Sequence, residues 1–414
     1  MTLRSVVASL ILSLLPVTAR PDGPVRGGNA AADSLKRWGV ELGLDFDPGD
    51  RDAAHPSMEE RRATSQTGYF AWLNGELGRS DDAISDPPQA FREYLRTRRE
   101  ALSRIVSVLE KGPPQWPVRE TDETWAFRSL LATVQLERIL LAMALCEERD
   151  DKALAASRTL EAAWSLGRPA AEGDYLIHQT LAVGIGKLQA GALRKIRSPS
   201  SAWLSRLDGD EPSLRMFAAV ERESERSPGR ELADFHRAMH AMWRAAAERL
   251  QKLPACDAVG ESDGELWRGI KGAFENDSSA VVRASAALPP RPTPEANAEP
   301  DEEQPISLQD ELQLVTDPIR RAARLRVDRE LTRKILELRM QADASANGEF
   351  PAALPDGSSR VCPGSTYSYR RIGAGMEIRF DGAVESAGGE PLLPLSFRAG
   401  ASKPRAASET AEQP

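Results

Sequence analysis

The sequence predicts a mainly α-helical protein: an antiparallel helical bundle or hairpin array, with a small α+β module at its C-terminal end. Apolar residues recur at spacings of three and four along most of the chain, which is the period of an amphipathic helix. Aromatic residues make up only 6% of the 414 residues, and alanine is abundant, which favours helices packed through small side chains. From Asn347 to Phe380 the pattern changes to turns and short strand-like runs, which predict the C-terminal module.

Residues 1–19 have the pattern of a signal peptide. Arg4 precedes an apolar run from Val6 to Leu15, and Val17-Thr18-Ala19 then supplies a cleavage site. The run is shorter than the roughly 20 residues that cross a bilayer. We therefore expect cleavage after Ala19, export to the periplasm or the extracellular space, and no membrane association afterwards.

Residues 20–56 are rich in Gly, Pro, Asp and Ala and predict a loosely ordered entry segment. The helical body is expected over residues 57–284, beginning with a capping box formed by Ser57 and Glu60. Helices joined by short turns pack as antiparallel neighbours. The pattern resembles a hairpin array of the tetratricopeptide kind, but it has no fixed period. An irregular helical bundle is equally consistent.

The composition changes sharply at residues 285–305, which are rich in proline and acidic residues and predict a disordered linker. Residues 306–397 then predict a long helix followed by a small β module. Asp317-Pro318 has the pattern of a helix start, so we expect the long helix to be broken or kinked there. Its two pieces can still stack on the body, with the linker looped out. Residues 398–414 predict a disordered tail.

Two short motifs follow the long helix. The first is the turn from Asn347-Gly348 through Phe350-Pro351 to Leu354, and the second is Tyr367-Ser368-Tyr369. Together they resemble the end of type II secretion pseudopilins and minor pilins, in which a long helix leads into an Asn-Gly-x-Tyr-Pro-x-x-Leu turn and a Tyr-x-Tyr strand. The arrangement is also similar to exported bacterial proteins in which a helical body precedes this ending. The resemblance covers residues 330–385 and implies a helix-to-sheet topology without implying an activity.

The charge of the chain does not favour a nucleic-acid partner. The formal net charge is −8 at neutral pH, and a nucleic-acid-binding protein normally has a basic surface. The cluster Arg96-Thr97-Arg98-Arg99 is flanked by Glu93 and Glu100 and is typical of a solvated helix face. The expected partner is therefore a protein of unknown identity.

The three cysteines are Cys146, Cys256 and Cys362. Cys146 lies in an apolar helical run and is expected to be a buried small residue. Cys256 and Cys362 both lie beside prolines in loop-like sequence, and a disulfide between them would tie the C-terminal module to the body. The cysteine count alone does not fix this pairing.

Several short motifs resemble catalytic, metal-binding or phosphate-binding sites, but the residues around them do not complete such a site. His236 and His240 are four residues apart on a predicted helix, so they are weak metal candidates, but the spacing lacks the glutamate of a zinc-protease motif. Gly260-Glu261-Ser262-Asp263-Gly264 matches a nucleophile elbow, yet no histidine follows His240. The acidic run from Asp45 to Asp52 lacks the glycine and glutamate of a calcium loop. Gly184-Ile185-Gly186-Lys187 lies inside a predicted helix and is not a phosphate loop.

The sequence therefore assigns no catalytic, cofactor-binding or metal-binding residue. The favoured hypothesis is an exported, non-enzymatic helical scaffold or protein-binding protein of the cell envelope. Two alternatives stay open: an exported, hydrolase-like enzyme with a site that no motif marks, and an accessory of a secretion or pilus system. A scaffold of this kind binds partners in a groove, and the candidates to line it are Trp72, Trp125, Trp164, Trp203 and Trp243.

Overall fold

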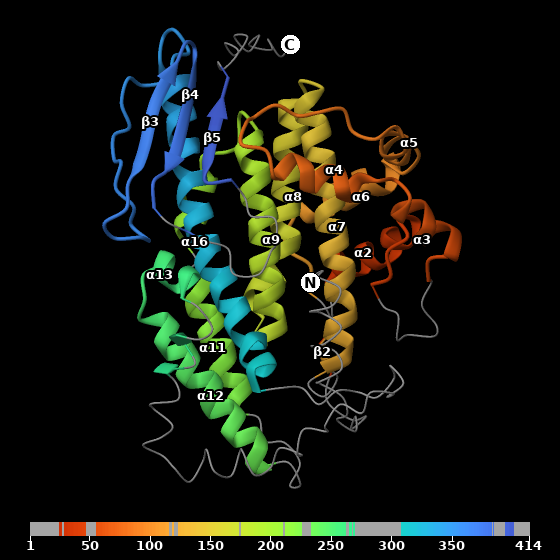
Figure 1. The fold of residues 1–414 in the computed structure, drawn as a ribbon. Coiled ribbons are helices and arrows are strands. Elements are labelled where there is room, and N and C mark those ends of the chain that lie inside the picture. Colours follow the sequence, from red (N-terminus) through yellow and green to blue (C-terminus); the bar gives the residue numbers. More distant parts are fainter. Residues whose placement is uncertain are drawn as a thin grey trace, which may run out of the picture.

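The computed structural model describes residues 25–26, 29–46, 55–115, 118–119, 123–173, 175–209, 212–225, 233–261, 265–266, 268–269, 308–382, 384 and 394–400. The predicted fold class is confirmed, because the described chain is mainly helical and ends in a small antiparallel sheet (Figure 1). The signal-peptide pattern, the linker at 285–305 and residues 401–414 of the expected tail lie outside the described residues. The expected start of the tail at residue 398 is wrong, because Arg398 and Ala399 belong to a paired strand, Ser396–Ala399. None of the described helices combines the length and apolar character that a bilayer crossing requires.

The helices fall into an N-terminal group, a middle group and one long helix near the C-terminal end. Their bounds are α2 (Ala30–Glu41), α3 (Met58–Ser65), α4 (Tyr69–Leu77), α5 (Gln89–Thr97), α6 (Arg99–Leu109), α7 (Glu123–Arg149), α8 (Ala153–Glu172), α9 (Leu176–Lys195), α10 (Ala202–Gly209), α11 (Pro212–Glu225), α12 (Ala233–Gln251), α13 (Ala255–Gly260) and α16 (Leu308–Ala344). The strands are β1 (Val25–Arg26) and β2 (Val118–Arg119), which pair with each other, and β3 (Tyr367–Ile372), β4 (Gly375–Phe380) and β5 (Ser396–Ala399).

Two helix starts illustrate how local sequence sets the structure. The capping box is present at α3: Ser57 Oγ accepts from the Glu60 backbone N–H at 3.2 Å, and the Ser57 N–H donates to the Glu60 carboxylate at 2.7 Å. At α2 the Asn29 side chain accepts from Ala32 N–H at 3.0 Å. The expectation of a loosely ordered entry segment does not hold for residues 29–46, because α2 buries Leu35 against the helical core and Phe46 is buried as well.

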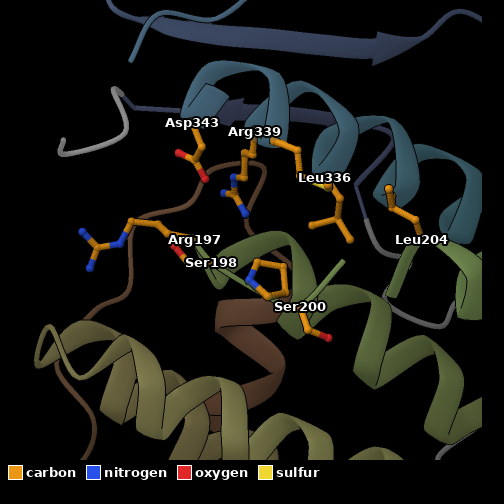
Figure 2. A pocket seen from close by; sticks show the side chains of 9 residues that line it. Arg197, Ser198, Ser200, Leu204, Leu336, Arg339 and Asp343 are labelled. Carbon is orange, nitrogen blue, oxygen red and sulfur yellow. The ribbon is translucent and has the colours of Figure 1, made fainter. Parts of the chain in front are cut away.

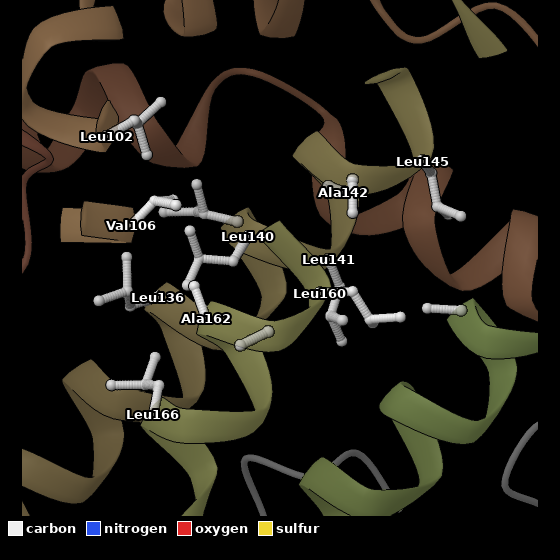
Figure 3. Packing of buried hydrophobic residues seen from close by; sticks show 14 of the residues in the cluster. Leu102, Val106, Leu136, Leu140, Leu141, Ala142, Leu145, Leu160, Ala162 and Leu166 are labelled. Carbon is white, nitrogen blue, oxygen red and sulfur yellow. The ribbon is translucent and has the colours of Figure 1, made fainter. Parts of the chain in front are cut away.

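The N-terminal helices share one core. Leucine, isoleucine and alanine side chains of α6, α7 and α8 interlock there, as Figure 3 shows for residues such as Leu102, Leu140 and Leu160. Helix α7 packs against both α8 and α9, and α2 packs against α6. These contacts bury the stripes that the apolar period predicted.

Helix α16 is the central element of the other half of the molecule. It packs against α9, α10, α11, α12 and α13, and residues such as Leu331, Ile335 and Leu338 are buried. The expected break at Asp317-Pro318 is absent, because Pro318 lies inside one continuous helix. Helix α16 shares its core with the body, which is the stacked arrangement that the sequence left open.

The C-terminal sheet has the order β3-β4-β5 with both pairs antiparallel. Alternate residues face the core around α16, and the residues between them face outward. The inward set comprises Tyr367, Tyr369, Met376, Ile378, Phe380, Phe397 and Ala399, which all pack in or against that core. The outward set includes Ser368, Arg370, Glu377, Arg379, Ser396 and Arg398.

A disulfide joins Cys256 of α13 to Cys362 in the loop before β3, with the two Cα atoms 5.6 Å apart. The structure thus contains the pairing that the sequence left as one possibility. The Ala255 backbone N–H donates to Val361 O at 3.0 Å beside it. Cys146 is buried on α7 as a free thiol.

We expect the purified protein, denatured without reductant, to react with a thiol reagent at one cysteine per chain, Cys146, and at all three after reduction. The variant Cys256→Ser/Cys362→Ser should lose about 2–4 kcal/mol of unfolding free energy, since the bond closes a long loop in the unfolded chain. Urea denaturation measures this loss, and Cys146→Ala serves as a control that keeps the bond. Three reactive thiols before reduction would contradict the assignment.

Candidate functional site

Two consecutive cations at the end of α9 hold the sheet in place. Three of the hydrogen bonds that Arg194 donates are 2.8 Å long: Nε to Thr332 Oγ1, Nη2 to the Asp328 backbone carbonyl, and Nη1 to the Pro394 carbonyl. The Asp328 carboxylate lies 3.4 Å from Nη2. The guanidinium thereby ties α9 both to α16 and to the chain that enters β5.

Lys195 holds a different segment. Its Nζ donates to the carbonyls of Asp81 and Ala83 at 3.0 and 2.8 Å, and the Glu76 carboxylate lies 3.4 Å away. This segment covers the free edge of β5, where Arg398 N–H donates to Ser80 O at 2.8 Å. The N-terminal helices and the C-terminal sheet are therefore joined through Lys195.

Burial shifts the pKa values of Arg194, Lys195 and Asp328. It lowers the pKa of the Arg194 guanidinium and of the Lys195 ammonium, and the nearby acids Asp328 and Glu76 oppose this. Burial raises the pKa of the Asp328 carboxyl, opposed by Arg324 and then Arg194. Both cations donate their hydrogen bonds to acceptors within the protein. We therefore interpret them as groups that position the sheet.

A hollow lies next to this joint, between α16 and the loop after α9 (Figure 2). Its empty space is about 280 Å³, part of which is open solvent. Arg339 and Asp343 project from α16 toward the loop in Figure 2, and Arg339 donates to the Ile196 carbonyl at 2.8 Å. Arg197 is bound by Glu148 and Asp151. Arg339 also lies 3.8 Å from the Asp82 carboxylate. Both arginines thus have partners within the protein, and we interpret the hollow as part of the joint between the two elements.

The loop before β3 is fixed by one buried carboxylate of α16. Glu330 accepts from Ser359 Oγ and from the Arg360 N–H, both at 2.6 Å, and from the Tyr367 hydroxyl at 3.0 Å. Glu330 therefore fixes both the loop and the start of β3 on the central helix.

The outer face of the sheet carries three exposed arginines around one carboxylate. Glu377 of β4 accepts from Arg398 Nε at 2.7 Å on one side and from Arg370 Nε on the other. The side chains of Arg370, Arg379 and Arg398 are 66%, 70% and 64% exposed. Hydrogen bonds from Arg398 and then Arg370 lower the pKa of Glu377. We call Arg370, Glu377, Arg379 and Arg398 the arginine face, and it is the candidate functional site.

The weak metal candidates of the sequence gain no support. His236 and His240 lie on α12, but their side chains are outside those that the structure describes, so the metal hypothesis stays untested. Among the described residues no three His, Cys, Asp or Glu side chains form a metal-holding group. Ser262 and residues 47–52 of the acidic run also lie outside the described chain. Gly184 to Lys187 lie within α9, as expected.

The candidate tryptophans whose side chains are described lie in different parts of the molecule. Trp203 is 1% exposed and packs edge-on against Trp164 with ring centroids 5.3 Å apart. Arg206 lies over both rings. Trp72 and Trp243 are partly buried against two different cores, and the Trp125 side chain is not described. Trp164 and Trp203 both line a small hollow beside α9 and α10, and the prediction of a partner-binding groove stays a prediction.

Comparison with known proteins adds no relative. No family model matches the chain, and no match was found among curated proteins or solved structures. The assignment of the candidate site therefore rests on the geometry of the structure alone. Sequence reasoning missed the arginine face, although the alternation in Met376-Glu377-Ile378-Arg379-Phe380 was a usable signal for one charged sheet surface.

Glu137 is a buried carboxyl that lies outside the candidate site. Glu137 of α7 is fully buried, and its Oε1 accepts from Gln189 Nε2 at 2.8 Å. No hydrogen-bond partner of its Oε2 lies within the described chain. Burial raises the pKa of Glu137 well above 4.5, and the Gln189 hydrogen bond opposes this only in part.

We expect Arg194→Met to lower the free energy of unfolding by about 3–5 kcal/mol, because removing the cation takes away the donor of several buried acceptors and leaves the buried Asp328 carboxylate with Arg324 as its remaining ion-pair partner. Urea denaturation measures the change. The matched control is Arg104→Met, whose side chain is 63% exposed and should cost about 0.5 kcal/mol or less. Similar losses for the two variants would contradict a central role for Arg194.

We expect Glu137→Gln to flatten the pH dependence of stability above pH 4.5, the ordinary carboxyl value. The unfolded chain loses this proton near that value, whereas the folded chain keeps it to a higher pH. The wild-type protein therefore loses stability as pH rises, at most by about 1.4 kcal/mol per pH unit. Denaturation at pH 5, 6 and 7 measures the difference, and parallel curves for the two proteins would contradict the prediction.

Proposed function

We propose that the protein is an exported, non-enzymatic scaffold of the cell envelope that binds a protein partner through the arginine face. Residues 1–19 support export by their pattern. The disulfide between Cys256 and Cys362 also supports it, because such bonds persist in oxidising compartments outside the cytosol.

The observation that carries the proposal is a charged surface that is ordered before any partner arrives. Glu377 holds Arg370 and Arg398 by hydrogen bonds, while their side chains stay mostly exposed. The sheet beneath is fixed to the body by Arg194 and by the disulfide. A surface ordered in advance loses less conformational entropy on binding, which favours affinity.

A second candidate function is an accessory role in a secretion or pilus system. One contact favours it: the Tyr369 hydroxyl donates to the Pro351 carbonyl at 2.6 Å. This hydrogen bond joins the two short motifs that carry the resemblance to pseudopilins. In this candidate the partner is a component of the assembly, and the binding surface is the same.

We expect a photo-crosslinking amino acid at Ser368, an exposed position on the outer face of the sheet, to capture a partner protein in producing cells. The control position is Leu154, which is 78% exposed at the start of α8. Mass spectrometry of the crosslinked bands should identify a partner from Ser368 that Leu154 does not yield.

A different result would favour the enzyme alternative over the scaffold proposal. That result combines three observations: no crosslink from Ser368, no protein recovered by affinity capture from envelope extract, and one zinc ion per chain by metal analysis. The same partner at equal yield from both positions would instead place the binding surface elsewhere.

A further inference from the structure

We propose that the arginine face recognises an extended, acidic segment of the partner protein, with carboxylates at alternate positions. This inference rests on the proposed function and specifies the chemistry of the partner. Arg370 and Arg398 each direct Nε to Glu377, so the ion pairs within the face do not use the paired Nη groups. An arginine binds a carboxylate bidentately through two such parallel donors.

The spacing of the arginines fits an extended chain. Arg370 and Arg398 lie directly opposite Glu377 on the two strands that flank β4, and Arg379 lies two residues further along β4. Diagonal neighbours of this kind are separated by about 7–8 Å. Side chains on one side of an extended strand recur about every 7 Å. Carboxylates at positions i and i+2 of a bound segment can therefore reach two arginines at once.

The charge of the face differs from that of the whole chain. The formal net charge is −8, yet this face presents three arginines against two acids, Glu377 and Asp381. Asp381 lies 3.8 Å from Arg379 and is not hydrogen-bonded to its Nε. A local positive surface on an acidic protein selects an acidic partner segment and orients its approach.

Two other occupants are disfavoured by the same residues. Ile372 is the one large apolar side chain of β3 that is strongly exposed, at 46%. An arginine contributes only about 1 kcal/mol at an anionic membrane surface, so three arginines with one apolar residue bind a bilayer weakly. A second copy of this chain would place arginines against arginines, which is repulsive.

The test uses the full chain and two short synthetic peptides, one alternating glutamate with threonine and the other alternating glutamine with threonine. The protein variants are R370Q/R379Q/R398Q and a matched control, R96Q/R104Q/R158Q, whose side chains are 74%, 63% and 62% exposed. Fluorescence anisotropy should show binding of the glutamate peptide that weakens with salt. The face variant should lose affinity about tenfold or more, and the control should retain it.

Several results would overturn the inference: equal binding of the glutamine peptide, equal loss in both variants, no binding of either peptide, or self-association of the wild type that the face variant abolishes. Vesicles containing phosphatidylglycerol that bind with the same arginine dependence would assign the face to a lipid surface instead. The crosslink from Ser368 separates the two proposals. If R370Q/R379Q/R398Q keeps that crosslink, the scaffold function stands and acidic recognition fails.

Discussion

The end of α9 is the point on which the tertiary structure depends. Successive residues of a helix point about 100° apart, so Arg194 and Lys195 serve different neighbours. Arg194 reaches α16 and the entry to β5, and Lys195 reaches the carbonyls of residues 81 and 83. Segments that are more than 300 residues apart in the chain, Ser80 and Arg398, consequently lie side by side. These two cations act together with the Cys256–Cys362 disulfide and the hydrogen bonds of Glu330 to hold the C-terminal sheet on the body.

Buried cations of this kind contribute more to a unique arrangement than to net stability. Removing a charge from water costs several kcal/mol, and interactions with buried partners offset this cost only when the partners are well placed for hydrogen bonds. Arg194 meets the condition through Thr332 and the Asp328 carbonyl, which lie one helical turn apart on α16. A shift of α16 by one residue would break both bonds. We infer that these contacts set the register of α16 against α9, and through it the position of the arginine face.

Short-range sequence patterns predicted the features that depend on neighbouring residues, namely the helices and their starts. The period of apolar residues located the helices, and Ser57 with Glu60 marked a helix start that the structure confirms. Features that depend on contacts between distant parts of the chain were not predicted. Helix α16 is rich in charge, so its sequence is typical of a surface helix, but Arg324 and Asp328 are buried, and Asp328 is bound by Arg194, a residue more than 100 positions earlier in the chain. Pro318 continues the helix because Ile319, Ala322 and Ala323 pack into the core, which offsets a cost of about 3 kcal/mol. The arginine face required the strand pairing as well as the sequence.

The bond between Cys256 and Cys362 spans a sequence separation of 106 residues. A single cleavage of the backbone anywhere between these cysteines would leave two pieces that remain covalently joined. Because α13 and the loop before β3 are held together by that link, a nicked molecule would keep both parts of its framework. A protease could therefore cut the chain once between these cysteines without separating the sheet from the helices that position it.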